Sequence, residues 1–234
     1  MLNEVALELH IAFGSFGLVC FWASAALRKG SARHRLTGRL YFIALAVVVG
    51  SAVPLTAAAF VDRNRIVGGF LASLILITAT TGRSAWRAAR NRNSPEHFFD
   101  RPYHGLAVAN IASGLAMLVV GVLERIPIVA VFAAVGITLG LTMLQRASRQ
   151  RATGQWSALE AHYANVIGCG VATHIAFLNL GLTRWLPETL QTWVQPIAWL
   201  GPLAVAFLVT RWLDARYSRK RAPQRTAAIV EDAA

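Results

Sequence analysis

Acidic residues are scarce in this chain, and its long apolar runs hold almost none of them. The 234 residues include 11 Asp and Glu against 23 Lys and Arg. Within the apolar runs only Glu8 and Glu160 occur, and each lies near the end of its run. A carboxylate proton relay or a cation-transport site inside a membrane therefore has little support. Both lysines, Lys29 and Lys220, lie outside the runs, which excludes a retinal-type Schiff base.

Cysteine and the common metal motifs are also scarce. The two cysteines, Cys20 and Cys169, fall in separate apolar runs and form no C-x-x-C pair. The sequence thus excludes zinc-ribbon and thioredoxin-type motifs, and we interpret both thiols as small buried hydrophobes. The chain also lacks H-E-x-x-H, H-x-x-x-H and nucleotide-binding motifs.

What the chain does have is a succession of long apolar runs. Hydrophobic residues make up 56% of it, and runs near or above 18 residues recur along nearly the whole length, as in membrane spans. The runs are continuously apolar, which favours helices over a β-barrel. We expect an all-α polytopic bundle formed by residues 1–213, followed by a basic, disordered tail at 214–234. The seven predicted spans are 5–27, 38–60, 66–86, 104–123, 127–146, 160–182 and 194–213.

Basic residues alternate between the loops in a way that predicts the orientation. Nineteen of the 23 lie in the first, third and fifth loops or after the last span, and four lie on the opposite side. By the positive-inside rule the N-terminus is outside and the C-terminus is cytoplasmic. The same rule explains the net charge of +12 without a nucleic-acid partner. We keep the first span in the mature protein, because Glu4 and Glu8 at its start are atypical of a signal peptide.

Three histidines mark the cytoplasmic ends of the second, fourth and sixth spans. These are His34, His104 and His162, whereas His97 belongs to a polar loop where we expect it to be solvated. A histidine ring tolerates such an interface by reaching towards water. The recurrence on three helices nevertheless favours an inner histidine cluster.

His10 and His174 lie deeper, in the outer halves of the first and sixth spans. His174 is about 18 Å beyond His162 by the helical rise per residue. Because an imidazole in hydrocarbon is costly unless paired or ligated, we expect His10 and His174 to meet near the outer face. The alternative is a neutral histidine that hydrogen-bonds to a neighbouring helix.

Two histidine clusters at two depths suit a membrane cytochrome with two b-type haems. Each low-spin iron takes two axial imidazoles from separate helices. His10 and His174 would hold the outer iron, and His162 would hold the inner iron together with His34 or His104. Twelve residues leave His162 and His174 about 120° apart around their helix, so that helix would need two buried sides or a bend.

The stretch LHIAFGSFGLVCFWASAALRKGSARHRLTGRLYF, at 9–42, resembles the opening of the domain-of-unknown-function 2306 family. The matching features are His10 with the following glycines, RKG, HR, GR and Tyr41; a later match is His162 with AFLN at 176–179. The resemblance covers residues 9–180. It implies a helical bundle in a bacterial inner membrane and supplies no activity.

The leading functional hypothesis is a haem-b electron-transfer protein of the inner membrane that exchanges electrons with quinone. The main alternative is an accessory or assembly protein, or a subunit of a larger membrane complex, that binds a cofactor without turnover. A transporter and a sensor are further alternatives. The lipid bilayer is the expected partner in every case.

Overall fold

The computed structural model describes residues 2–61 and 64–218, and this part of the chain contains helices and no strand. The order along the chain is α1 (Leu2–Ala26), α2 (Ala32–Val61), α3 (Arg65–Arg90), α4 (Pro95–Phe98), α5 (Arg101–Leu123), α6 (Pro127–Thr153), α7 (Ala158–Ala176), a π-helix η1 (Phe177–Leu182), a 3₁₀ turn η2 (Thr183–Trp185) and α8 (Glu188–Ser218).

Six of these helices are long and apolar enough to cross a membrane, namely α1, α2, α3, α5, α6 and α8. The prediction of an all-helical membrane fold is therefore confirmed. The predicted sixth span coincides with α7 and η1, which are not among the six. His162, Asn165 and His174 lower the hydropathy of this segment, so a count of seven spans stays a prediction.

Two features, one in the α3–α5 connection and one near the C-terminus, differ from the sequence prediction. The predicted polar loop before the fourth span contains the short helix α4, whose Phe98 is buried, although His97 is exposed as expected. Helix α8 continues to Ser218, so 214–218 are helical and not part of a disordered tail. The remainder of the predicted tail, 219–234, lies outside the described residues.

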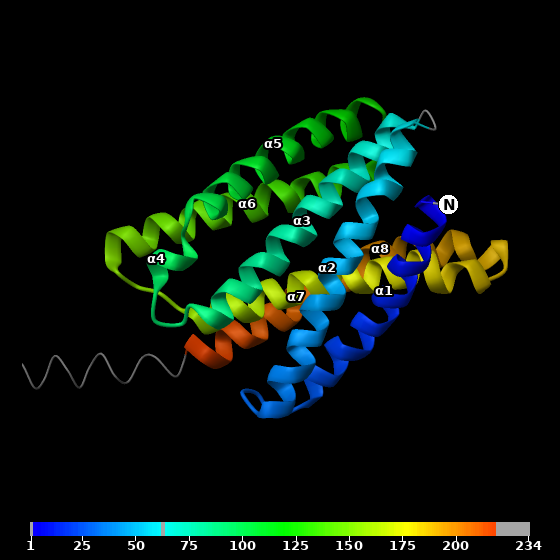
Figure 1. The fold of residues 1–234 in the computed structure, drawn as a ribbon. Coiled ribbons are helices and arrows are strands. Elements are labelled where there is room, and N and C mark those ends of the chain that lie inside the picture. The colour runs from blue at the N-terminus through cyan, green and yellow to red at the C-terminus, as the bar shows by residue number, and fades with distance from the viewer. Residues whose placement is uncertain (1, 62–63, 219–234) are drawn as a thin grey trace, which may run out of the picture.

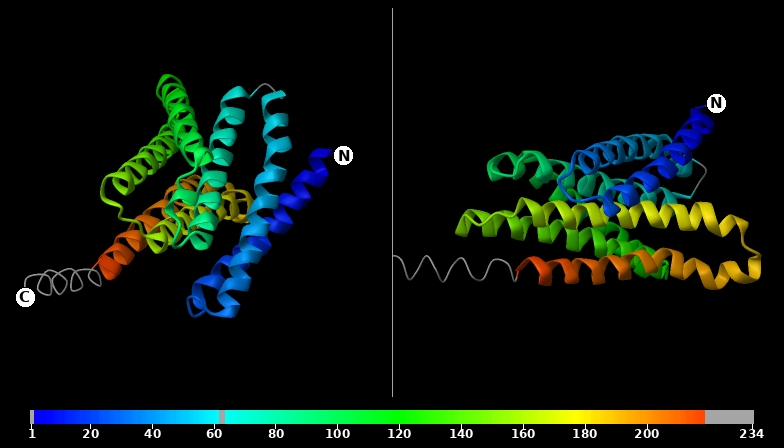
Figure 2. Two further views of the ribbon diagram at one scale, coloured as in Figure 1. Left: turned by 60° about the vertical axis from the view of Figure 1, so that its left-hand side comes forward. Right: turned by 90° about the horizontal axis from the view of Figure 1, so that it is seen from below.

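Helical pairs build the bundle around α3. The pairs α1–α2 and α5–α6 each form an antiparallel hairpin, and α3 packs against α2, α5 and α7 between them (Figure 1). Figure 2 shows α7 and α8 running back along one side of the bundle. Helix α8 packs mainly on α7 and the π-helix, so most of its apolar surface faces outwards.

Small residues set the close approach of α5 and α6. A Cβ added at Gly114 would lie 2.8 Å from the main-chain oxygen of Ala133, and one at Gly121 would lie 2.7 Å from the nitrogen of Ala130. Such close backbone contact is typical of membrane helices, which associate by packing and not by the hydrophobic effect. The hairpin packs on α3, and α3 in turn is the main neighbour of α7.

Candidate functional site

His34 and His162 lie at the same end of the bundle, within range of an electrostatic interaction. His34 is in the first turn of α2, and its Nδ1 lies 3.1 Å from the main-chain oxygen of Ser24 on α1. His162 is near the start of α7, and its Nδ1 lies 3.0 Å from the oxygen of Ala85 on α3. The two imidazoles are close enough to interact electrostatically. Of the two partners that the sequence left open for His162, His34 is the one that interacts with it electrostatically.

The hydrogen bonds define which ring nitrogen of each histidine is available. A main-chain oxygen can only accept, so the Nδ1 of His34 and of His162 carries the proton and donates. Each Nε2 is then left with a free lone pair. Metal-bound histidines usually donate their other ring N–H to a carbonyl or carboxylate in this way, which fixes the ring and raises its basicity.

The local fold explains why the His34 ring is held. The carbonyl of Ser24 is in the last turn of α1, where a helix leaves oxygens without intrahelical partners. His34 Nδ1 and the Nζ of Lys29 both donate to this oxygen, the latter at 3.0 Å. The short α1–α2 connection therefore fixes the His34 imidazole against the end of α1. The same bonds place a lysine beside it.

The donor set around these two histidines suits iron that is already held by a porphyrin. Within the described residues no group of three or more His, Cys, Asp and Glu side chains could hold a metal ion. A structural zinc site needs four protein ligands, and an exposed catalytic zinc needs three. A bis-histidine haem needs only two imidazoles from separate helices, because the porphyrin supplies the other nitrogens. His34 and His162 meet that requirement, because both are imidazoles and they come from separate helices.

His10 lies apart from the inner pair and lines a large cavity. Its Nδ1 lies 3.1 Å from the oxygen of Val48 and 3.2 Å from the hydroxyl of Ser51, both on α2. The cavity is half-open and has a volume of about 1610 Å³. Residues of α1, α2, α3, α6, α7 and α8 line it. Of the five histidines that the sequence singled out, His10 alone lines it. Asn165, one turn from His162, also lines it.

The predicted meeting of His10 and His174 is wrong. The Nε2 of His174 accepts a hydrogen bond of 3.0 Å from the indole nitrogen of Trp22. Trp22 and His10 are both on α1 and twelve residues apart, which is about 18 Å along the helix. The sequence placed both histidines at similar depth, but α7 crosses α1 near the inner end of α1, where Phe21 packs against Gly170.

His174 has the environment of a partly buried, hydrogen-bonded histidine. Its Nδ1 lies 2.6 Å from the oxygen of Gly170 on its own helix, and its ring packs edge-on against Phe21 and Trp22. Both ring nitrogens are thus engaged, so a ligand role would require Trp22 to move. The interpretation as a neutral histidine bonded to a neighbouring helix describes this residue.

His104 belongs to a separate polar cluster at the start of α5. Its Nδ1 lies 3.0 Å from the main-chain oxygen of Asp100, and its Nε2 is buried without a partner. The Asp100 carboxylate caps α5 and accepts from Arg83 at 2.5 Å and from Arg87 at 3.1 Å. This cluster joins α3 to α5. No other histidine ligand from the described residues accompanies His104.

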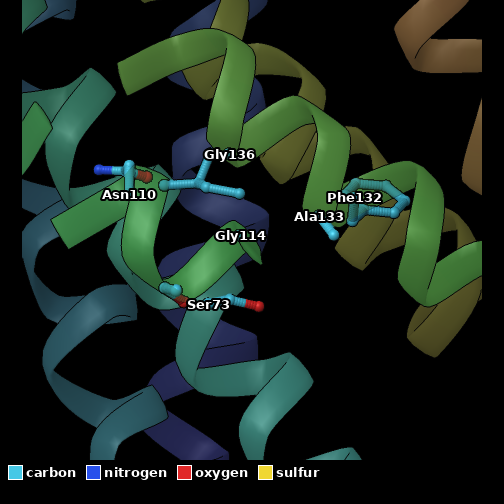
Figure 3. A pocket seen from close by; sticks show the side chains of 8 residues that line it. Ser73, Asn110, Gly114, Phe132, Ala133 and Gly136 are labelled. Carbon is cyan, nitrogen blue, oxygen red and sulfur yellow. The ribbon is translucent and has the colours of Figure 1, made fainter. Parts of the chain in front are cut away.

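A second crevice lies at the junction of α3, α5 and α6. Figure 3 shows Asn110 and Gly114 facing Gly136 across it, with Ser73 below. It leaves no room for a water molecule. Asn110 instead donates to Thr80 at 2.8 Å, so the crevice is a packing detail of the helix junction and not a binding site.

Trp22 and Ser51 are the contacts that sequence reasoning missed. Each bonds a histidine on another helix, and neither lies at a spacing that would reveal the contact. The depth of a residue follows from its position along a span, whereas its partner depends on how the helices cross.

In comparisons with family models, curated proteins and solved structures, no match to this chain was found.

Proposed function

We propose that the protein binds b-type haem between α2 and α7, with His34 and His162 as axial ligands, and transfers electrons at the cytoplasmic side of a bacterial inner membrane. Bound there, haem would supply a one-electron couple. The protein's own residues would fix both imidazoles and shield the site within the bundle. Quinone in the bilayer is the proposed exchange partner. The outer haem expected from His10 and His174 is not part of the proposal.

A single observation carries this proposal, namely the arrangement of the His34 and His162 rings. Both donate Nδ1–H to a main-chain oxygen, both keep a free Nε2, and they come from different helices within electrostatic reach. Lys29 beside His34 and Arg92 near His162 add positive charge. This charge suits the two carboxylates that haem carries at its edge.

The proposed membrane setting rests on topology and resemblance. Seven spans with a cytoplasmic C-terminus place His34 and His162 on the cytoplasmic side, where the basic loops gather. The resemblance of 9–42 to the domain-of-unknown-function 2306 family supports a bacterial inner membrane. His10, His34 and His162 are all among the residues that carry this resemblance.

Substitution of individual histidines tests the proposal. We expect His34→Ala and His162→Ala each to remove the Soret absorption of protein purified with its cofactors, because one imidazole cannot hold low-spin iron alone. His97→Ala is the matched control: it removes a histidine that is 69% exposed, and the spectrum should not change. A Soret band that survives both His34→Ala and His162→Ala would overturn the assignment.

The same preparation separates the proposal from its alternatives. Metal found by elemental analysis without a Soret band would favour a metal-binding accessory protein. If His104→Ala loses haem and His34→Ala retains it, the inner ligands are His162 and His104, the other pairing that the sequence left open. Haem that binds but cannot be reversibly reduced would indicate an assembly role without turnover.

A further inference from the structure

The large cavity has dimensions that suit a ligand dissolved in the membrane. Its volume of about 1610 Å³ exceeds the roughly 300–1,000 Å³ of typical small-molecule pockets. It is half-open and lies between helices whose outer surfaces are apolar. A ligand would therefore enter from the hydrocarbon phase and carry a long apolar part.

Aromatic side chains form the apolar part of the cavity wall. Phe70, Phe132 and Trp199 come from α3, α6 and α8, and their rings contact one another at centroid distances of 5.5–5.7 Å. All three line the cavity. Such a wall accommodates a hydrocarbon tail, and it gives the tail no polar group to recognise.

His10 gives the cavity a specific hydrogen-bond requirement. Its Nδ1 proton is donated to the carbonyl of Val48, so its Nε2 can only accept. The Ser51 hydroxyl is itself bonded to the Val48 oxygen at 3.0 Å, and it holds the same edge of the ring. The opposite edge of the imidazole is left for the cavity. A ligand that satisfies it must present an O–H or N–H donor at the depth of His10.

We propose that this cavity binds a membrane-soluble quinol, with a ring hydroxyl donating to the Nε2 of His10. A quinol combines a donor on an aromatic ring with an apolar tail, whereas the acyl chains of phospholipids offer no donor at this depth. The oxidised quinone has lost its hydroxyl protons and cannot satisfy the same nitrogen. The inference rests on the proposed function only for the quinol's role as electron donor.

The test compares the two redox forms of one short-tailed ubiquinol as probes. Binding to the purified full-length protein, in quinone-free lipid nanodiscs, can be followed through quenching of its tryptophan fluorescence, since Trp199 lines the cavity. We expect the quinol to bind about tenfold more tightly than the quinone, which corresponds to one net hydrogen bond. His10→Ala should abolish this preference. His10→Gln should keep part of it, because its amide oxygen also accepts.

Two further variants make the outcome decisive. Ala172→Phe partly fills the cavity and should weaken both forms equally, whereas His97→Ala should change neither. Equal affinities for quinol and quinone in the unaltered protein would overturn the inference, as would a preference that survives His10→Ala. Ordinary lipid is the occupant if neither probe binds, and that result also overturns it.

His162→Ala separates this inference from the proposed function. If both are correct, this variant loses its Soret band and keeps the quinol preference, since His162 does not line the cavity. A quinol preference in protein that never shows a Soret band would sustain the cavity and end the haem proposal. A Soret band without quinol preference would sustain the haem proposal and end the cavity inference.

Discussion

At the scale of single residues, one feature is common to His10, His34, His104, His162 and His174, the five histidines of the long helices. In each, Nδ1 lies 2.6–3.1 Å from a main-chain oxygen, so the proton is on Nδ1 in every case. What differs is the surroundings of Nε2. It has no hydrogen-bond partner in His34 and His162, belongs to a cavity-lining ring in His10, accepts from a tryptophan in His174 and lies in a closed polar cluster in His104. The same tautomer therefore serves quite different roles.

The Trp22–His174 bond should contribute measurably to stability. Trp22→Phe removes the donor to His174 Nε2 and retains an aromatic ring of similar packing. In a double-mutant cycle with His174→Ala, we expect a coupling of about 0.6 kcal/mol, and no more than about 1.7 kcal/mol, as for other hydrogen bonds between membrane helices. Reversible unfolding in detergent measures it. Strictly additive effects would show that the bond contributes nothing.

Sequence reasoning succeeded with the histidines at one end of the bundle and failed with the two that were expected to lie deeper. The position of each histidine along an apolar run predicted that His34 and His162 lie at the same end of the bundle, and an electrostatic interaction links the two. The pairing of His10 with His174 failed because the position of a residue along its own helix does not reveal the level at which that helix crosses another. The crossing of α1 and α7 places Trp22 beside His174.

At the scale of helices, glycine positions determine which neighbours pack most closely. In the α5–α6 hairpin, four glycines face the other helix of the pair. An added Cβ at several of them would contact main-chain atoms. Main chain cannot rotate away as a side chain can. The α1–α2 hairpin has more open glycines, of which Gly50 has no atom within 4 Å of an added Cβ.

This difference predicts opposite effects for two matched substitutions. Gly114→Ala places a Cβ 2.7 Å from Ile137 and 2.8 Å from the Ala133 oxygen, so it should destabilise the protein by about 1–3 kcal/mol. Gly50→Ala meets open space and should stabilise α2 by about 0.5–1 kcal/mol, because alanine is the better helix former. Thermal unfolding of both variants measures this. Equal effects would contradict the packing argument.

The positions of the long helices could be predicted from the sequence, whereas some of their ends could not. Apolar runs predicted a helix at each of the seven positions, since continuous hydrophobicity needs no tertiary contact to be recognised. Helix α4 was missed because four residues between polar neighbours leave no periodic signal. The extension of α8 to Ser218 was missed because its last turns are polar, and Tyr163 holds Asp214 there at 2.5 Å.

At the scale of the whole molecule, the path of α7 decides the topology. If α7 and the π-helix cross the membrane, the chain has seven spans and its termini lie on opposite sides. If they do not, the six apolar helices return both termini to one side. The asymmetry of 19 to 4 basic residues favours the first arrangement.

Reporter fusions distinguish these arrangements directly. We expect a reporter at the C-terminus to be active only as a cytoplasmic fusion, and one at the N-terminus to be active only as a periplasmic fusion. A cysteine introduced in the loop between α3 and α5 serves as the internal control, and it should be protected from an impermeant thiol reagent. Both termini on one side would show that α7 does not span the membrane.

The central claim is that His34 and His162 hold haem, and a difference spectrum tests it most directly. The full-length protein, purified from cells supplied with iron and never exposed to chelators, is measured after oxidation and again after reduction. The account predicts one low-spin b-type species, with a Soret band that shifts reversibly and one haem per chain. Protein that shows no Soret band, although it is folded and retains its bound lipid, would contradict the account.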